Sequence, residues 1–443
     1  MKIRDFLEID FSLFLASIIL TVFGVLFIYS SGMSSSGTMV SNEYTKQIIW
    51  AVVGVVITLI ISMLNYKKIY DFSLYLYIIV ILLLIYTFIN GRFGGDVQGI
   101  GRWITIGGFR IQPSEFAKIT TILFLARYMD STKHSQNKII RFVLSCVIVL
   151  TPMFIVMIQP DLGTALVFIP ILMVMCFIGG IPIRYVFFLG GCVFLTGSMT
   201  LLPLWQEIIL RGELPAIMIL KNFRFILVSI VVFALISGFS YFGYKRFRKR
   251  YFYWICYGAV MLILSLAVSY FSHKILKDYQ MMRLIVFLDP NVDPRGSGWH
   301  IIQSMTAIGS GGFMGKGFLQ GTQSHYRFLP TQSTDFIFSI FTEEWGFRGG
   351  LAVMALFLFI CLRLIRLMRI TSDTFGAYIA AGLAAMYAFH FIINTGMTMG
   401  IMPITGIPLL FMSYGGSALI SAMAGIGLAM SIHVRRFDRG MSL

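Results

Sequence analysis

The sequence predicts an all-α membrane protein, a polytopic bundle of transmembrane helices with a large extracytoplasmic loop. Of its 443 residues, 58% are hydrophobic and only 12% are charged, and the mean hydropathy is +0.84. A soluble domain usually carries about 25% charged residues. Many apolar runs approach the roughly 20 residues that cross a bilayer as a helix, where backbone hydrogen bonds must be satisfied within the protein. We therefore expect a helix bundle.

Twelve apolar segments are expected to span the membrane within a single domain that covers residues 1–443. The first run is long for the apolar part of a signal peptide, and no small-residue cleavage site is obvious, so we expect it to be retained. The last segment is long enough to contain a break, and Pro403 and Pro408 interrupt it. The segments are 9–31, 46–64, 69–90, 112–129, 139–158, 162–181, 184–205, 222–243, 251–272, 335–362, 375–396 and 404–432.

Basic residues predict the orientation of these segments. With a cytoplasmic N-terminus, nearly every strong basic cluster falls on the cytoplasmic side, as the positive-inside rule requires, and the C-terminus is cytoplasmic too. The net charge of +16 is then a topology signal, and no nucleic-acid partner is expected. The basic run at 245–250 is expected to anchor topology, with binding of anionic membrane lipids as the alternative. The outer side receives the turn at 159–161 and the loops 32–45, 91–111, 206–221 and 273–334.

Disulfide, metal and nucleotide sites are not predicted. The five cysteines lie in apolar runs without a CxxC pair, and the six histidines show no HxxxH spacing. The GGFMGKG string at 311–317 lacks the final Ser or Thr of an ATP-binding P-loop. The sequence therefore requires no cofactor.

Polar residues at the outer ends of apolar segments are candidates for function, because ionisable groups in a bilayer are costly. Glu115 and Lys118 are i,i+3 neighbours that can form an ion pair, which serves either packing or ligand positioning. Arg102 can hold phosphate oxygens with its planar guanidinium, or it can anchor the chain at the interface beside Trp103. Asp161 either caps the next helix or faces a site.

The long outer loop and the helix after it hold the remaining candidates. Lys316 and Gln323 lie in a Gly-rich stretch whose backbone can approach the phosphates of a pyrophosphate-linked lipid. Asp335 begins an apolar helix at the outer interface, where it is either an N-cap or a general base. Ser339 and Glu343 share a helix face with Asp335 by i,i+4 spacing.

At these motifs the chain resembles the SEDS family of shape, elongation, division and sporulation proteins. The matching strings follow family order over nearly the whole chain, so the resemblance is specific. GKGFLQGTQS looks like the elongation branch, because division members are closer to GLGNSVQK there. The strings are GRW at 101–103, QPSEFAK at 112–118, QPDLGT at 159–164, GSGWHIIQS at 296–304, AIGSGG at 307–312, GKG at 315–317, GTQS at 321–324, TDFIF at 334–338 and SYGGSALI at 413–420.

The resemblance implies a peptidoglycan glycosyltransferase that polymerises lipid II into β-1,4-linked glycan strands during cell elongation and the maintenance of cell shape. The essential aspartate of TDFIF is Asp335 here, and we expect it to act as the general base. The family's roles for Arg102, Glu115 and Lys118 carry over to this chain. The resemblance also implies a class B penicillin-binding protein and the elongation machinery as partners. The active site is expected on the extracytoplasmic side of the bacterial cytoplasmic membrane.

The remaining polar candidates are assigned to substrate binding. Positive charge from Arg102, Lys118 and Lys316 is expected to stabilise the leaving pyrophosphate. A divalent cation, Mg²⁺ or Mn²⁺, is compatible with this chemistry, although the sequence shows no dedicated metal cage. The residues expected to bind pyrophosphate or sugar are Arg102, Glu115, Lys118, Asp161, Lys316, Gln323 and Ser339.

Two features depart from the family pattern. Residues 330–333 read PTQS, without the acidic residue that usually follows FLP, so no role of that acid is carried over. The family bundle has ten helices, whereas about 60 residues within 206–272 are expected to insert two more and to preserve the sidedness downstream. Two alternatives stay open. One is a lipid II flippase, whose acidic groups should lie near the membrane midplane, and the other is a division-type polymerase.

Overall fold

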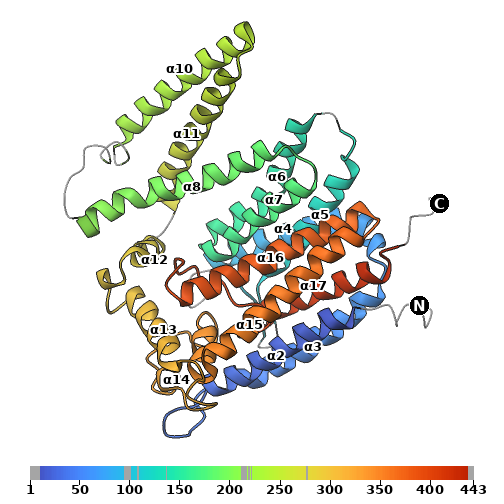
Figure 1. Ribbon diagram of the computed structural model, residues 1–443, viewed down its shortest axis with the longest axis vertical. Coiled ribbons are helices and arrows are strands. Elements are labelled where there is room, and N and C mark those ends of the chain that lie inside the picture. The colour runs from blue at the N-terminus through green and yellow to red at the C-terminus, as the bar shows by residue number, and fades with distance from the viewer. Residues whose placement is uncertain are drawn as a thin grey trace. The chain divides into compact units, whose positions relative to one another are not determined.

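The computed structural model is almost entirely α-helical, with one short β-hairpin (Figure 1). The chain divides into two compact units: unit 1 comprises Met1–Gly180 and His300–Leu443, and unit 2 comprises Ile181–Trp299. The structure describes residues 10–93, 101–106, 109–135, 137–210, 217, 220, 222–275 and 278–437.

The elements of each unit follow one another along the chain. Unit 1 contains α2 (Phe11–Ser31), α3 (Glu43–Met63), α4 (Tyr66–Phe93), β1 (Ile104–Ile106), β2 (Phe109–Ile111), α5 (Pro113–Ser131), α6 (Lys138–Ile158), α7 (Leu162–Ile178), α14 (Thr322–His325), α15 (Ile337–Ile370), α16 (Thr374–Thr398) and α17 (Gly416–Val434). Unit 2 contains α8 (Ile183–Trp205), the π-helix η1 (Gln206–Leu210), α10 (Phe223–Phe247), α11 (Arg250–Ile275), α12 (Asp278–Leu288) and the 3₁₀ helix η2 (Pro290–Val292). Helix α13 (Ser297–Gly311) begins in unit 2 and continues in unit 1.

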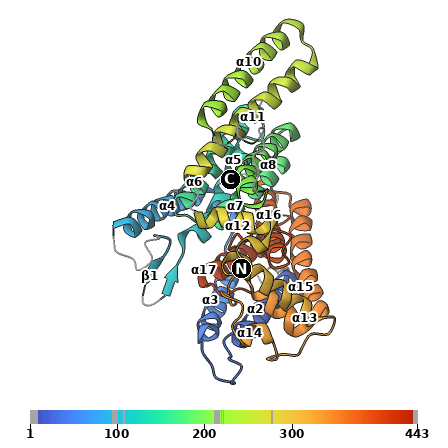
Figure 2. The ribbon, with the colours of Figure 1, turned by 90° about the vertical axis from the view of Figure 1, so that its left-hand side faces the viewer.

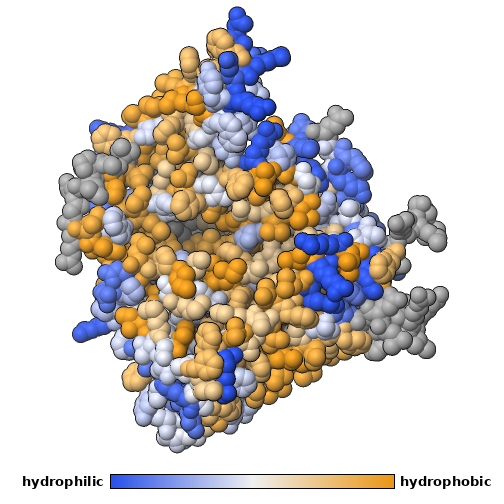
Figure 3. All heavy atoms as spheres, viewed as in Figure 1, coloured by the Kyte–Doolittle hydropathy of each residue, from blue (hydrophilic) through white to orange (hydrophobic). Residues whose placement is uncertain are grey.

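The predicted spans agree with the observed helices. In the described part of the chain, ten helices are long and apolar enough to cross a membrane. The other two predicted spans are α5, which carries Glu115 and Lys118, and α7, which has only 17 residues. Figure 3 shows hydrophobic residues over much of one face, as expected where lipid replaces water. The predicted all-α transmembrane bundle is therefore confirmed.

Two segments differ from the prediction: the long outer loop contains more helix than expected, and the last predicted span contains less. The long outer loop at 273–334 contains α12, η2, α13 and α14 among its described residues, so it is largely folded. The last predicted span is helical only from Gly416 onward, and residues 403–415 form an irregular segment before α17. The expected break is confirmed, and Pro403 and Pro408 lie within it, where their missing N–H groups break no helix.

Helices α5, α16 and α17 form the centre of unit 1. Helix α16 packs against α5, α7 and α15, and α17 packs against α3 and α5 (Figure 1). Small residues permit this packing, because a Cβ added at Gly427 of α17 would lie only 2.8 Å from the carbonyl oxygen of Thr58 in α3. Thr58 Oγ1 also donates to the carbonyl oxygen of Met423 at 2.9 Å. Helices α3 and α17 therefore form one closely packed pair.

The start of α2 and the end of α17 lie together at one end of unit 1, opposite α13 and α14 (Figure 1). Asp10 caps α2 there and pairs with Arg363 at 2.5 Å. Burial acts to raise the pKa of the Asp10 carboxyl, but hydrogen bonds from Ser12 and Arg363, together with the charge of Arg363, hold that pKa below its usual value. The side of the membrane on which each end lies stays a prediction.

Candidate active site

A pocket of about 220 Å³ in unit 1 brings together residues that are far apart in the sequence. Its wall comes from the two ends of the β1–β2 hairpin, the starts of α5 and α7, the turn before α15 and the irregular segment before α17. The hairpin contacts α17 through β2, and Figure 2 shows it from the side. The predicted site residues Arg102, Glu115, Asp161 and Asp335 line this pocket, with Trp103, Gln112, Thr164, Thr334, Gly406, Pro408, Tyr414, Gly415, Ser417 and Ala418.

Asp335 lies half-buried in the turn just before α15. The N-cap residue of α15 is Phe336, which forms no side-chain capping bond. The alternative in which Asp335 is the N-cap is therefore wrong, and Asp335 lines the pocket. Ser339 and Glu343 lie within α15, whereas Asp335 precedes it, so the helix face that the sequence predicts for the three residues is not formed.

The irregular segment before α17 holds the turn before α15 in place. Ser413 Oγ donates to the carbonyl oxygen of Thr334 at 2.6 Å, and the Tyr414 N–H donates to the carbonyl oxygen of Ser333 at 2.8 Å. Ser413 Oγ also accepts from the Leu409 N–H at 2.8 Å, so its position is fixed from both sides. These bonds connect the backbone beside Asp335 to residues about 80 positions later in the chain.

Asn394 of α16 connects the same two segments from the interior. Its side chain is fully buried, and Nδ2 donates to the carbonyl oxygen of Asp335 at 3.0 Å and to that of Ile407 at 2.8 Å. A buried amide with two acceptors of this kind sets their separation, because each unpaired carbonyl would cost about 1–3 kcal/mol. Asn394 therefore positions the backbone of Asp335.

Replacing Asn394 by Leu is expected to lower kcat more than it changes KM. The variant keeps the side-chain volume but leaves the carbonyls of Asp335 and Ile407 without their donor. The turn that carries Asp335 is then no longer held in position by α16. The matched control is Ser431→Ala, which removes a partly buried 2.6 Å hydrogen bond to the Leu64 carbonyl oxygen near the far end of α17. Steady-state kinetics and melting temperatures of both variants test this. Equal loss of activity in the two variants would show a purely structural role for Asn394.

Asp161 has both roles that the sequence left open. It is the N-cap of α7, where Oδ1 accepts from the Thr164 N–H at 3.2 Å and Oδ2 accepts from Thr164 Oγ1 at 3.0 Å. Oδ2 also accepts from Gln112 Nε2 at 2.8 Å, which ties the start of α7 to the residue before α5. Asp161 therefore lines the pocket with its oxygens already hydrogen-bonded.

The Arg102 guanidinium is used by the protein itself. Its Nε donates to the Gln159 carbonyl oxygen at 2.7 Å, and a terminal nitrogen donates to the Pro160 carbonyl oxygen. Gln159 Nε2 in turn donates to the Leu84 carbonyl oxygen at 2.8 Å and to Thr87 Oγ1 at 3.1 Å. Arg102 thus joins the chain before β1 to the turn before α7, and much of its donor capacity is spent on backbone.

Glu115 and Lys118 form the predicted ion pair, at 2.8 Å, and both side chains are buried. Lys118 Nζ also lies 3.0 Å from His390 Nε2, and His390 Nδ1 lies 3.0 Å from the Pro408 carbonyl oxygen. A carbonyl only accepts, so Nδ1 carries the hydrogen and Nε2 accepts from Lys118. This chain of contacts connects α5 through α16 to the irregular segment, and Glu115 and Pro408 are its two ends at the pocket.

Lys316 and Gln323 belong to a different cluster. Lys316 Nζ lies 2.7 Å from Glu343 Oε1 and 2.7 Å from Thr322 Oγ1. The same Glu343 oxygen accepts from the N–H groups of Thr322 at 2.8 Å and Gln323 at 3.0 Å. These hydrogen bonds hold the Gly-rich loop against α15. Neither Lys316 nor Gln323 lines any of the three pockets described in this section.

Ser339 is also placed away from the pockets. Its hydroxyl is buried and lies 2.6 Å from Ser304 Oγ, which donates to the Thr398 carbonyl oxygen at 2.7 Å. Ser339 therefore joins α13, α15 and α16, and its expected contact with substrate stays a prediction.

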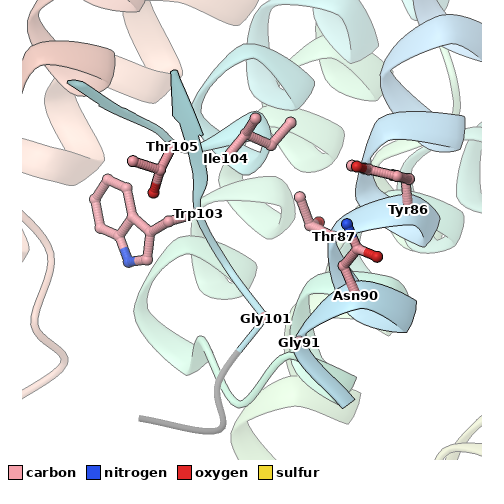
Figure 4. A pocket seen from close by; sticks show the side chains of 8 residues that line it. All are labelled: Tyr86, Thr87, Asn90, Gly91, Gly101, Trp103, Ile104 and Thr105. Atoms are coloured by element: carbon pink, nitrogen blue, oxygen red, sulfur yellow. The ribbon is translucent and has the colours of Figure 1, made fainter. Parts of the chain in front are cut away.

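Two further pockets adjoin the first and share Trp103 with it. The pocket of about 300 Å³ is lined by Tyr86, Thr87 and Asn90 of α4 and by residues 103–105 at the start of β1. The Ile104 side chain points toward α4, whereas Trp103 and Thr105 lie on the other side of the strand (Figure 4). The other pocket, of about 460 Å³, is lined by Glu43, Lys46, Trp50, Trp103, Arg110, Thr334, Tyr414, Gly415 and Gly416. Trp103 lines all three pockets, and the turn that carries Asp335 lines two of them.

Several residues that line these pockets or hold their walls were not predicted from the sequence. Lys46 and Arg110 are cations on the predicted outer side, and this exception to the positive-inside bias was the signal that could have identified them. Asn394 and His390 gave no such signal, because a polar residue inside a span does not reveal its partner.

The Tyr414 phenol lines two of the pockets. Burial and the nearby Glu43 carboxylate raise the pKa of this phenol, and Arg110 partly offsets the rise, so Tyr414 keeps its proton near neutral pH.

Fold and site together define a multi-pass membrane protein with a carboxylate-lined pocket at one end of its helix bundle. The family model described as "Cell cycle protein", covering FtsW, RodA and SpoVE, matches residues 11–211 and 253–437. The chain belongs to this family, which confirms the SEDS resemblance.

Individual relatives are similar in sequence to this chain over almost its whole length. A peptidoglycan glycosyltransferase RodA from Treponema pallidum is 49% identical and covers 98% of this chain and 100% of that protein. The peptidoglycan glycosyltransferase MrdB from Escherichia coli is 32% identical, covering 98% of this chain and 95% of that protein.

Solved structures share the fold. A chain from a study titled as the structural coordination of polymerization and crosslinking by a peptidoglycan synthase complex aligns with a TM-score of 0.66 and 24% identity, over 97% of this chain and 99% of that one. The rod shape determining protein RodA from Thermus thermophilus aligns with a TM-score of 0.59 and 20% identity, over 97% of this chain and 98% of that one.

Proposed function

We propose that this chain polymerises lipid II into β-1,4-linked glycan strands during cell elongation, with Asp335 as the general base. The chain is a peptidoglycan glycosyltransferase, as its full-length relatives are named. The observation that carries the assignment of the base is the position of Asp335. It lines a pocket formed by five separate parts of the chain, and its backbone is held by α16 and by the segment before α17.

The proposed reaction is a displacement at the anomeric carbon of the donor sugar. The 4-hydroxyl oxygen of the acceptor N-acetylglucosamine attacks this carbon, and its proton passes to the Asp335 carboxylate. The bond from the anomeric carbon to the phosphate oxygen breaks, and the electron pair leaves with the undecaprenyl pyrophosphate. Attack from the opposite face converts the α-linked phosphate into a β-1,4 glycosidic bond.

The pocket shown in Figure 4 suits a sugar of one substrate. Tyr86, Trp103 and Ile104 contribute aromatic and apolar lining, while Thr87, Asn90 and Thr105 contribute neutral hydrogen-bonding groups. Sites for small molecules usually combine apolar walls with a few polar groups that fix orientation. No charged residue lines this pocket among the described residues, which favours a neutral saccharide over a phosphate.

The proposed function also implies an orientation in the membrane and a set of protein partners. We place both termini in the cytoplasm and the Asp335 pocket on the extracytoplasmic side of the bacterial cytoplasmic membrane, in line with the basic clusters of the sequence. A class B penicillin-binding protein and the elongation machinery are the proposed partners. The similarity to a chain of a peptidoglycan synthase complex supports a transpeptidase partner.

No cofactor is required by the proposal, and a divalent cation is compatible with it. Among the described residues, no group of three His, Cys, Asp or Glu side chains is placed to hold a metal ion, so Mg²⁺ or Mn²⁺ would supply its positive charge through the pyrophosphate oxygens. Polymerisation measured after EDTA treatment, and again after addition of either ion, tests this point.

The deciding experiment measures polymerisation and lipid transport on one preparation. The purified chain, with its transpeptidase blocked by a β-lactam, is given lipid II, and glycan products are separated on a gel. The same chain in vesicles is given labelled lipid II on one leaflet. We expect polymer in the first assay and no transport in the second. Transport without polymer would favour the flippase, whose acidic groups should lie near the membrane midplane. Complementation of an elongation or a division mutant separates the two polymerase branches.

A further inference from the structure

The three cations expected to meet the pyrophosphate are all engaged within the protein. Arg102 donates to two backbone carbonyls, Lys118 is buried in an ion pair with Glu115, and Lys316 pairs with Glu343. A cation that already has close partners gains less from a new anion, because the existing bonds must be given up or shared. The leaving group therefore needs positive charge from elsewhere.

Lys46 and Arg110 are cations without such partners. Both side chains are exposed, and neither forms an ion pair within 4.0 Å in the part of the chain that the structure describes. Both line the pocket of about 460 Å³, which has Glu43 as its acidic residue. Two cations against one carboxylate leave this pocket with a net positive charge.

The cationic pocket adjoins the one that contains Asp335. The two have four lining residues in common, one of which, Thr334, directly precedes the catalytic aspartate; these residues are Trp103, Thr334, Tyr414 and Gly415. An anion held by Lys46 and Arg110 would therefore lie next to the site where the glycosidic bond forms. The neutral Tyr414 hydroxyl adds a hydrogen-bond donor between the two pockets.

The surface beside Lys46 suits a lipid-linked anion. Lys46 and Trp50 lie in the first two turns of α3, and the same helix exposes Ile49, Val52 and Val53. Those apolar side chains face outward along a membrane-spanning helix, where a prenyl chain would lie among lipids. A cationic pocket at the end of an apolar helix face matches a pyrophosphate at the end of a long hydrocarbon.

We propose that Lys46 and Arg110 bind the pyrophosphate of the prenyl-linked substrate and stabilise its charge as it leaves. The proposal rests on the proposed function and deepens it. Arg110 offers a planar set of donors that fits two phosphate oxygens at once, whereas Lys46 offers a compact point charge. A phospholipid headgroup presents the same phosphate chemistry, so the test must separate the two sources.

The test measures binding without turnover. Full-length protein in nanodiscs of zwitterionic phospholipid is titrated with farnesyl pyrophosphate, farnesyl monophosphate and farnesol, and binding is followed through the fluorescence of Trp50 and Trp103, which line the pocket. The double variant Lys46→Gln/Arg110→Gln is expected to bind the pyrophosphate about 10- to 100-fold more weakly. Farnesol binding should not change. Lys46→Arg/Arg110→Lys should retain most of the affinity, and Arg327→Gln, an exposed arginine that lines none of the three pockets, should match wild type.

Each outcome decides the proposal. Equal pyrophosphate affinity in wild type and the double glutamine variant would overturn it, as would an equal loss for farnesol. Repeating the titration in nanodiscs with anionic phospholipid identifies a headgroup site, because such lipids would then abolish pyrophosphate binding in wild type. Lipid II polymerisation by wild type, measured in parallel, separates the two claims. Polymerisation with unchanged binding in the variant sinks only this subsite, whereas no polymerisation by wild type sinks the proposed function.

Discussion

Replacing Asp335 by Asn is expected to lower lipid II polymerisation by about 100- to 10,000-fold, the usual contribution of a positioned general base. The amide has nearly the same shape as the carboxylate but cannot take the proton of the attacking hydroxyl. The bond from Asn394 goes to the backbone carbonyl of Asp335, so the substitution leaves it intact. The melting temperature of the variant should therefore stay close to that of wild type while kcat falls.

A second Asp→Asn change provides the control for this experiment. Asp130, near the predicted cytoplasmic end of α5, is also partly buried and accepts hydrogen bonds from Lys133 and Thr374. Asp130→Asn should polymerise lipid II like wild type. Polymer yield from Asp335→Asn within tenfold of wild type would place the base on another residue.

Replacing Lys118 by Met is expected to destabilise the protein by about 3–5 kcal/mol, because it leaves the buried Glu115 carboxylate without a counter-charge. His390 Nε2 loses its donor in the same step. Because His390 also holds the Pro408 carbonyl, the irregular segment before α17 should loosen as well. The thermal midpoint in detergent, read by size-exclusion chromatography, measures the effect.

Two comparisons separate buried charge from simple loss of a lysine. The double variant Glu115→Leu/Lys118→Met removes both charges and should recover much of the lost stability, since apolar pairs often replace buried ion pairs without cost. Lys133→Met breaks an exposed 3.3 Å pair with Asp130 and should cost no more than about 1 kcal/mol. If Lys118→Met melts like Lys133→Met, the buried pair does not stabilise the fold.

The features that the sequence predicted correctly are those set by residues close together in the chain. Spans follow from local hydropathy, and the Glu115–Lys118 pair follows from the geometry of one helix turn, so both predictions hold. Asp161 was correctly expected at the start of a helix for the same reason. These properties need no knowledge of how separate helices are arranged.

What the sequence could not predict depends on contacts between elements. Arg102 and Lys316 have a charge suitable for pyrophosphate, but the backbone at 159–160 and the Glu343 carboxylate occupy them. Nothing in the motifs indicates that occupation, because the partners come from other helices or loops. The same holds for Asn394, whose two acceptors lie 59 and 13 residues away in sequence.

The irregular segment before α17 has a consequence for how the protein is made. Synthesis runs from the N-terminus, so α17 is the last of the described helices to be made. Yet Tyr414, Gly415 and Ser417 complete the wall of the Asp335 pocket, and Ser413 fixes the turn beside it. A chain halted before α17 would therefore contain Asp335, the proposed general base, but not the complete wall of its pocket. Incomplete products of translation that lack α17 are therefore expected to be inactive.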